Sequence, residues 1–264
     1  MKSFLIEDTA AVSRESSPVW ISPEALGRVA SRSTTIMEVV NILQTLESDA
    51  FTKAMADTLK RGAELLGDDW GYVDITNALY AISKLGRPEN YLEIGVRRGR
   101  SMCMVVAATP TVNVVGFDVW QDNYAGNENP GETLVKAELA KFGHSGRATF
   151  IGGDSRVTVR DYLSKHPDLT FDLMTVDGDH SAEGAIFDLE SVVDRLRVGG
   201  VLLFDDLDNP HCLDLNAVWD RFTAKYSNLR CHKIFNPLGF GVAIAVKTST
   251  LVGTVSGRSK WFGR

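Results

Sequence analysis

Residues 91–101 read YLEIGVRRGRS, a short apolar run followed by a turn with two glycines and the first residues of an expected helix. In a doubly wound α/β sheet such a strand–turn–helix unit lies beneath the ligand, because backbone N–H groups at the helix start face it. Glu93 stands near the strand end, where a carboxylate accepts hydrogen bonds from an ammonium group. Gly95 and Gly99 allow close approach of the backbone. A glycine turn alone would also suit any ordinary junction between a strand and a helix.

The spacing of these glycines excludes two common phosphate sites. A dinucleotide-binding turn has the pattern G-x-G-x-x-G, and counted from Gly95 its second and third glycines fall on Arg97 and Arg100. A phosphate-binding loop requires Gly-Lys-Ser or Gly-Lys-Thr, which this segment lacks. A nicotinamide-dependent oxidoreductase therefore does not fit the sequence.

Short apolar runs alternate with helix-length segments through the rest of the chain. We expect strands at residues 91–96, 114–119, 149–152, 171–176, 201–204, 231–235 and 241–246. This alternation predicts a parallel sheet with helices on both faces. Only residues 236–239 separate the last two strands, and so short a connection makes a hairpin with an antiparallel strand. The expected fold is a doubly wound, seven-stranded, Rossmann-like α/β sheet with a C-terminal antiparallel hairpin strand.

The spacing of apolar residues and the composition divide the chain into three parts. Apolar residues at helical spacing, such as Ile36, Val40 and Leu43, predict a helical extension over residues 1–88, which would form a substrate cap or an oligomer interface. The α/β domain is expected at residues 89–247. Residues 248–264 form a polar, basic tail.

Composition and charge exclude several classes of protein. The 264 residues carry 28 Lys and Arg against 34 Asp and Glu, a net charge of -6, which argues against nucleic-acid and membrane-surface partners. The longest wholly apolar run, residues 102–108, is far shorter than the ~20 residues that span a bilayer. The N-terminus lacks the apolar core of a signal peptide. Three widely spaced cysteines, Cys103, Cys212 and Cys231, suit a reducing compartment and no cysteine zinc site. We expect a soluble cytoplasmic protein.

The second and third strands also end in acids. Asp118 ends the second strand, the position at which ribose hydroxyls are held in such folds. Asp154 and Ser155 follow the third strand and are placed for a polar contact to a purine. For these two residues a helix cap is the commoner role.

The most acidic part of the chain follows the fourth and fifth strands. Residues 171–214 hold 11 acidic and two basic residues, a net charge of -9. Asp177, Asp205 and Asp206 come directly after apolar strands that are neighbours in the expected sheet, so their carboxylates would face one crevice. Their repulsion favours a divalent cation, and oxygen ligands favour Mg²⁺, Mn²⁺ or Ca²⁺ over zinc. We assign the remaining acids of the adjoining helix to exposed helix faces: Glu183, Asp188, Glu190 and Asp194.

His180 lies three residues beyond Asp177 and is the candidate general base. An imidazole of pKa ~6.5 is a poor match for a hydroxyl of pKa ~15.7, and a neighbouring metal ion that acidifies the hydroxyl removes this mismatch. The predicted ion and the predicted base therefore belong together. His211 is a second candidate for contact with a substrate.

Together these segments resemble the class I S-adenosylmethionine-dependent methyltransferases, and among them the metal-dependent sugar and macrolide O-methyltransferases. The resemblance covers about residues 88–247. It implies that Glu93, Gly95 and Gly99 line the methionine part of the cofactor, with Ser101 and Asp177 as further contacts. It also implies that Asp118 holds the ribose and that Asp154 and Ser155 border the adenine. The metal ligands implied are Asp177, Asp205 and Asp206, and the general base implied is His180.

Two segments depart from the family pattern. Residues 97–100, with three arginines, would hold the cofactor carboxylate or an anionic substrate such as a nucleotide sugar, or else be solvated. Residues 120–131 resemble a lid on the substrate side.

The sequence thus predicts an S-adenosylmethionine-dependent O-methyltransferase acting on a hydroxyl of a small molecule of the sugar or secondary-metabolite class, assisted by a divalent cation, Mg²⁺ by preference. The alternative is a non-catalytic S-adenosylmethionine-binding or assembly protein that retains the fold. Homo-oligomerisation through the N-terminal helices is a further expectation.

Overall fold

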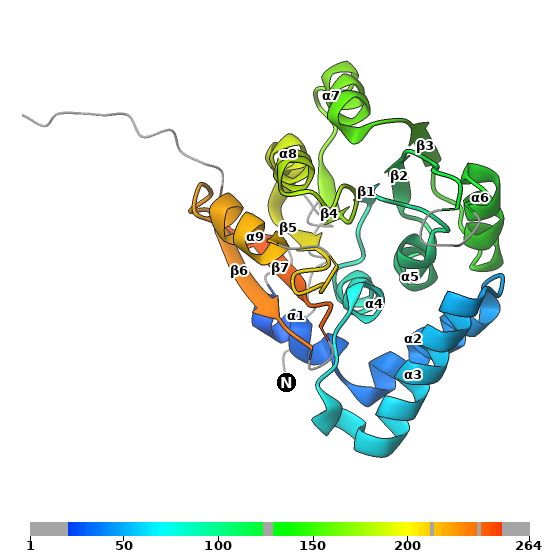
Figure 1. Cartoon of the computed structure of the whole chain (residues 1–264). Coiled ribbons are helices and arrows are strands. Elements are labelled where there is room, and N and C mark those ends of the chain that lie inside the picture. Colours follow the sequence, from blue (N-terminus) through cyan, green and yellow to red (C-terminus); the bar gives the residue numbers. More distant parts are fainter. Residues whose placement is uncertain (1–20, 124–128, 212–213, 237–238, 250–264) are drawn as a thin grey trace, which may run out of the picture.

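The computed structural model describes residues 21–123, 129–211, 214–236 and 239–249 (Figure 1). The expectations for residues 1–20, for the middle of the loop 120–131, for Cys212 and for the tail beyond residue 249 lie outside the described residues.

The core of the molecule is one seven-stranded sheet with the strand order β3-β2-β1-β4-β5-β7-β6. The first five strands are parallel, and β7 pairs antiparallel with both β5 and β6, which confirms the expected fold. The strands are β1 (Asn90–Ile94), β2 (Asn113–Asp118), β3 (Ala148–Gly152), β4 (Phe171–Val176), β5 (Leu196–Phe204), β6 (Leu229–Ile234) and β7 (Val242–Lys247). β5 begins five residues before its expected start, because Gly199 and Gly200 interrupt the apolar pattern while the pairing with β4 continues through a register shift.

Alternate residues of the strands enter two different cores, as the two-residue period of a strand requires. In β7, Val242, Ile244 and Val246 join the core on one face, and Ala243 and Ala245 join the core on the other. Helices α7 (Ser155–Lys165), α8 (Ala182–Val192) and α9 (Leu215–Thr223) cover the second face. Helices α4 (Ile75–Gly86), α5 (Arg100–Ala108) and α6 (Glu132–Lys141) cover the first (Figure 1).

The N-terminal part is helical, as expected. It contains α1 (Pro23–Ala30), α2 (Ser33–Thr45), α3 (Ala50–Leu66) and the 3₁₀ helix η2 (Gly67–Trp70) ahead of α4. Buried residues of α1 and α2, including Leu26, Ile36 and Val40, belong to the same core as the sheet residues Tyr91 and Leu203. The helices therefore pack against the α/β layer. Their role as a cap or an oligomer interface stays a prediction.

The arginines of the glycine loop are attached to this helical layer. Arg98, only 7% exposed, pairs with Asp49 at 2.9 Å and with Glu47 at 3.1 Å. Arg100 pairs with Asp49 at 3.2 Å and lies 4.7 Å from the centre of the Phe51 ring. A solvated role is therefore wrong for Arg98. In the described parts of the chain, no helix has both the length and the apolar character needed to cross a membrane.

Candidate active site at the carboxyl edge of the sheet

Backbone hydrogen bonds continue past the strand ends and bring the acids of β4 and β5 together. The Asp177 N–H donates to the Ile94 carbonyl at 2.9 Å, and the Asp205 N–H donates to the Val176 carbonyl at 3.3 Å. Since β1, β4 and β5 are neighbours in the sheet, their carboxyl ends meet at one crevice, where doubly wound folds bind ligands.

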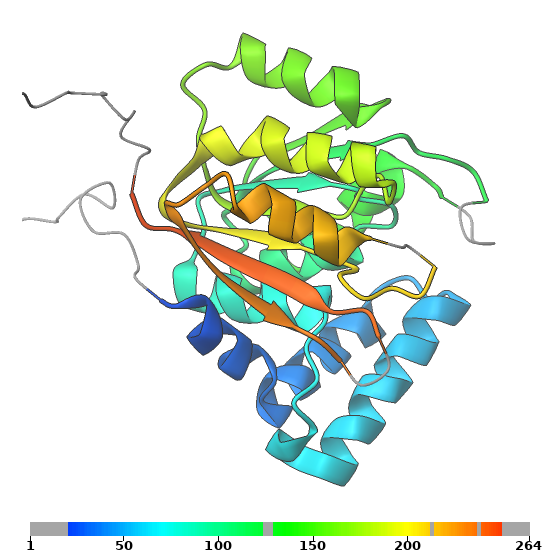
Figure 2. The same ribbon diagram turned by 60° about the vertical axis from the view of Figure 1, so that its left-hand side comes forward.

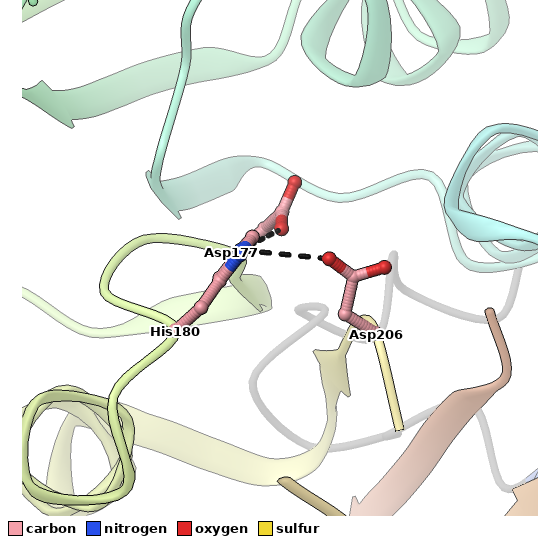
Figure 3. A group of neighbouring side chains, drawn as sticks. All are labelled: Asp177, His180 and Asp206. Carbon is pink, nitrogen blue, oxygen red and sulfur yellow. Dashed lines mark hydrogen bonds and ion pairs between the residues drawn. The ribbon is translucent and has the colours of Figure 1, made fainter. Parts of the chain in front are cut away.

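Asp177, His180 and Asp206 form a compact group at this crevice (Figure 3). One ligand atom from each residue lies within 4.8 Å of the other two. The His180 Nε2 atom is 3.4 Å from Asp177 Oδ1 and 3.5 Å from Asp206 Oδ2, so the imidazole bridges the two carboxylates. The three side chains are 15–27% exposed, which leaves the group open to a ligand. Two acids and the histidine predicted from the sequence are thus brought together.

Asp205 lies beside this group but outside it. Burial raises the pKa of its carboxyl well above the ordinary value, and the charges of Asp177 and Asp206 raise it further. Asp206 has a left-handed backbone, with φ 60°, and its Oδ2 accepts a hydrogen bond from Asn209 at 3.0 Å. The turn after β5 therefore directs the Asp206 carboxylate toward His180 and leaves Asp205 next to it.

The electrostatics of the group show excess negative charge. Burial raises the pKa of Asp177, the hydrogen bond from His180 opposes this, and the charge of Asp206 raises the pKa further. The hydrogen bond to Asp177 raises the pKa of His180 against the effect of burial, and the charges of Asp177 and Asp206 act in the same direction. These pKa shifts show that a positive charge at this place would stabilise the ionised carboxylates.

The glycine loop after β1 passes close to the turn after β4. Gly95 has φ 90°, and a Cβ at this position would collide with the backbone carbonyl of Asp177. Only glycine therefore allows the two turns to approach as they do. Gly99, with φ 73°, begins α5 and packs on the Val135 side chain.

Glu93 is fully buried at the end of β1 and lacks a cationic partner among the described residues. The Ser101 hydroxyl donates to its Oε1, while Oε2 has no hydrogen-bond partner. Burial, together with the charges of Asp177 and Asp118, raises the pKa of Glu93 to about 8. A buried carboxyl with an unpaired oxygen fits a ligand that carries a positive charge or an N–H donor.

Asp118 and Asp154 have their oxygens occupied by the chain itself. Asp118 accepts the backbone N–H groups of Arg97 and Trp120, each at 2.6 Å. Asp154 caps α7 by accepting the Arg156 N–H at 2.9 Å, pairs with the Arg156 guanidinium at 2.9 Å, and is 46% exposed. The helix-cap role weighed for Asp154 is present in the structure, and its contact with a ligand stays a prediction.

Asp188 corrects the sequence analysis. We placed it on an exposed helix face together with Glu183 and Asp194, which are exposed, but Asp188 is fully buried. The buried face of α8 carries Ala185, Leu189 and Val192, and position 188 lies on that face by helical spacing. The apolar period of α8 in the sequence already indicates a buried position for Asp188.

The buried Asp188 carboxyl lies behind the turn that carries Asp177 and His180. A Cβ added to Gly178 would be 3.1 Å from Asp188 Oδ2. Burial raises the pKa of Asp188 to about 6, and the Ser155 hydroxyl and the Asp179 N–H oppose this shift. Ser155 is the first residue of α7, and its contact with a ligand stays a prediction. Glu190 is half-buried and pairs with Lys225, and His211 is exposed.

Comparisons with known proteins place the fold. Residues 92–207 match the model of a methyltransferase domain family. Among solved structures, the chain is similar to the calicheamicin methyltransferase CalS11, at 21% identity over 89% of this chain and 98% of that one, with a TM-score of 0.50.

Two further solved structures are similar. The SAH-bound methyltransferase PaMTH1 of Podospora anserina is 15% identical over 88% of this chain and 99% of that one, with a TM-score of 0.53. An O-methyltransferase of Bacillus cereus in complex with SAH is 15% identical over 81% of this chain and 91% of that one, with a TM-score of 0.50. At these identities the likeness shows a shared fold. No curated protein matches the sequence.

Proposed function

We propose that the chain, whose residues 92–207 match a methyltransferase domain, is a class I S-adenosylmethionine-dependent methyltransferase that methylates a hydroxyl of a small molecule with the help of a divalent cation and His180 as general base. The observation that carries the proposal is the group formed by Asp177, His180 and Asp206. We further propose Mg²⁺ as the cation, a sugar or another secondary metabolite as the acceptor, and a cytoplasmic protein that associates through its N-terminal helices.

The donor set supports a hard divalent cation. Asp177 and Asp206 offer carboxylate oxygens on one side of a partly open crevice, and Asp205 adds a third carboxylate beside them. Oxygen donors are the ligands that Mg²⁺ prefers. A cation bound there would polarise an acceptor hydroxyl and lower its pKa.

The cofactor would lie along the outer half of the crevice. The unpaired Oε2 of Glu93 fits the ammonium group of the methionine moiety, with Gly95, Gly99 and Ser101 around it. Asp118 would hold the ribose, and Asp154 and Ser155 would border the adenine. Asp177 would contact both the cofactor and the cation. S-adenosylmethionine supplies an electrophilic methyl group.

The role of His180 follows from its position. Its Nε2 atom lies between two carboxylates, hydrogen-bonded to Asp177 at 3.4 Å and 3.5 Å from Asp206, and these contacts raise its affinity for a proton. His180 takes the proton of the acceptor hydroxyl. S-adenosylmethionine would supply the methyl group, whose bond to sulfur would break as the acceptor oxygen bonds to the methyl carbon. The products are the methyl ether, S-adenosylhomocysteine and one proton.

The test is methyl transfer to a panel of hydroxyl acceptors, measured as S-adenosylhomocysteine release with added Mg²⁺ or with excess chelator. Asp177→Ala and Asp206→Ala should lower divalent-dependent turnover about 10³-fold, because several kcal/mol of electrostatic stabilisation are lost. Asp206→Ala should still bind S-adenosylhomocysteine, because Asp206 is not among the proposed cofactor contacts. Full activity of both variants in excess chelator would contradict the metal assignment.

His180→Ala separates a base from a metal ligand. If His180 is the base, the variant should lose about 10²–10⁴-fold in turnover and still bind Mn²⁺. An unchanged rate would remove His180 as the base, and loss of Mn²⁺ binding would make it a ligand. Binding of S-adenosylmethionine by the wild type with no product from any acceptor would favour the non-catalytic alternative.

A further inference from the structure

The turn between α2 and α3, residues 46–49, is fixed to the α/β layer. Helices α2 and α3 lie side by side (Figure 2), and in Figure 1 the turn between them lies next to α6. The Glu47 N–H donates to the buried Glu138 carboxylate of α6 at 3.2 Å. Lys141 of α6 donates to the Thr45 carbonyl at 3.2 Å and pairs with Glu138 at 2.9 Å. The turn is thus held by the helix on which the glycine loop also packs.

Asp49 connects this turn to the glycine loop with the two oxygens of one carboxylate. Its Oδ1 accepts the Thr52 N–H at 2.7 Å and thereby caps α3. Its Oδ2 pairs with Arg98 Nε at 2.9 Å and with Arg100 Nη1 at 3.2 Å. Arg100 also donates to the Thr52 hydroxyl at 3.1 Å. One residue therefore holds both the start of α3 and the glycine loop.

The ion pairs of Asp49 are shielded from water. The side chains of Arg98, Arg100 and Asp49 are 7%, 12% and 14% exposed. The centre of the Phe51 ring lies 4.7 Å from the Arg100 guanidinium carbon, which adds a cation–π contact. Salt and water weaken ion pairs on an open surface, and shielding removes much of this competition. These pairs therefore restrict the position of the glycine loop.

The backbone of the glycine loop needs such support. Arg97 has φ 52°, a left-handed conformation that a residue with a side chain seldom adopts, and the glycines two positions before and after it also have positive φ. A conformation of this kind persists where the surroundings determine it. Asp118 accepts the Arg97 N–H at 2.6 Å from the side of β2, and Asp49 holds the next residue, Arg98, from the side of α3. The loop is thus fixed from two sides.

We propose that Asp49 and Arg98 are positioning residues for the cofactor. Together with Arg100 they form a clamp through which the N-terminal helices hold the glycine loop in the shape that binds the methionine part of S-adenosylmethionine. This inference rests on the proposed function and gives the helical extension a part in cofactor binding. In the clamp the guanidinium groups of Arg98 and Arg100 engage carboxylates of the chain itself.

The first test is Asp49→Asn in the full chain. Asparagine caps a helix about as well as aspartate, so the variant keeps the start of α3 and loses the charge that holds the arginines. The affinity for S-adenosylhomocysteine, measured by calorimetric titration well below the melting temperature, should fall about fivefold, because the loop adopts the binding shape for a smaller fraction of the time. Binding of Mn²⁺ should stay unchanged, since Asp177 and Asp206 are intact.

Two results would overturn the proposal. One is an affinity of Asp49→Asn for S-adenosylhomocysteine equal to that of the wild type. The other is an equal loss of Mn²⁺ affinity, because a general loosening of the fold weakens both sites and a clamp on the glycine loop weakens only the cofactor site.

The matched control removes another ion pair of the helical extension. Glu38 on α2 pairs with Lys84 on α4 at 2.7 Å. Lys84 lies near the end of α4, just ahead of β1, and therefore at the opposite edge of the sheet from the glycine loop. Glu38→Gln should change the affinity for S-adenosylhomocysteine less than about twofold. A loss as large as that of Asp49→Asn would contradict the clamp.

A double variant tests whether the two positioning residues act through their contact. Asp49→Asn and Arg98→Met each leave one charge of a shielded pair without its partner, and the double variant removes both charges. Each single variant and the double variant should lose about fivefold in affinity for S-adenosylhomocysteine, whereas independent residues would give a loss of about 25-fold in the double variant. The double variant also serves if a single variant fails to fold. A loss near the product, or none in the double variant, would contradict the clamp.

The outcome is separable from the proposed function. If the wild type does not bind S-adenosylhomocysteine, the proposed function fails. If the wild type binds it and Asp49→Asn binds it equally well, only the clamp is wrong.

Discussion

The acids at the two outer strand ends of the crevice differ from those at the three central ones. After β2 and β3, Asp118 and Asp154 accept backbone N–H groups, and Asp154 also pairs with Arg156. At the ends of β1 and β4, burial and neighbouring carboxylates raise the pKa values of Glu93 and Asp177. At the end of β5 the same holds for Asp205.

This difference indicates where the ligands that carry positive charge belong. The outer acids are satisfied by the chain and serve mainly to shape the loops. The raised pKa values of the central acids show that their ionised forms lack compensation, which a cofactor ammonium and a divalent cation would supply. The acidity noted in the sequence is therefore concentrated at three neighbouring strands of the sheet.

The largest effect among the outer acids is expected at Asp118. Asp118→Ala removes a carboxylate that holds two backbone N–H groups of the loops after β1 and β2, so the affinity for S-adenosylhomocysteine should fall about tenfold. The exposed Asp154 is the matched control, and Asp154→Ala should change the affinity less than about threefold. Calorimetric titration measures both. Equal losses of affinity would show that Asp154 contributes as much to cofactor binding as Asp118 does. Asp154 would then be a main contact.

A smaller effect is expected from Glu93→Gln in the ligand-free protein. The folded state raises the pKa of Glu93 from 4.5 to about 8, so the folded chain holds this proton to higher pH than the unfolded chain does. The associated stability is full below pH 4.5 and is lost as the pH rises toward 8. Glutamine keeps the shape and carries no charge. The variant should melt close to the wild type near pH 5 and a few degrees above it at pH 8.5.

The melting curves need one control. Glu183→Gln replaces an exposed acid at the start of α8 and should show no such pH dependence. If the melting temperatures of Glu93→Gln and the wild type differed by the same amount at both pH values, Glu93 would not be an uncompensated central acid.

The sequence was sufficient for the features that follow from local pattern and sheet topology. The strands were visible as apolar runs, and the ends of parallel neighbours must meet at one edge, which placed Asp177 beside the turn of Asp205 and Asp206. The hairpin at the C-terminus followed from the short connection between β6 and β7.

The features that escaped prediction depend on contacts between distant segments. Arg98 is buried against Asp49, which lies 49 residues earlier, and Asn236 binds Val73 across 163 positions. Nothing in the local period of either segment reveals such a partner. Asp188 is different, since the helical spacing that buries Ala185 and Leu189 also buries Asp188, and the sequence held that signal.

The central claim is that the acids after β4 and β5 form a divalent-cation site. Titration of Mn²⁺ into the protein, followed by the electron paramagnetic resonance signal of the free ion, tests it most directly. We expect the wild type to bind one Mn²⁺ per chain, Asp177→Asn and Asp206→Asn to bind it at least about 100-fold more weakly, and Asp118→Asn to bind it like the wild type. A wild type that binds no Mn²⁺, or Asp177→Asn and Asp206→Asn variants that bind it as tightly as the wild type, would contradict the account.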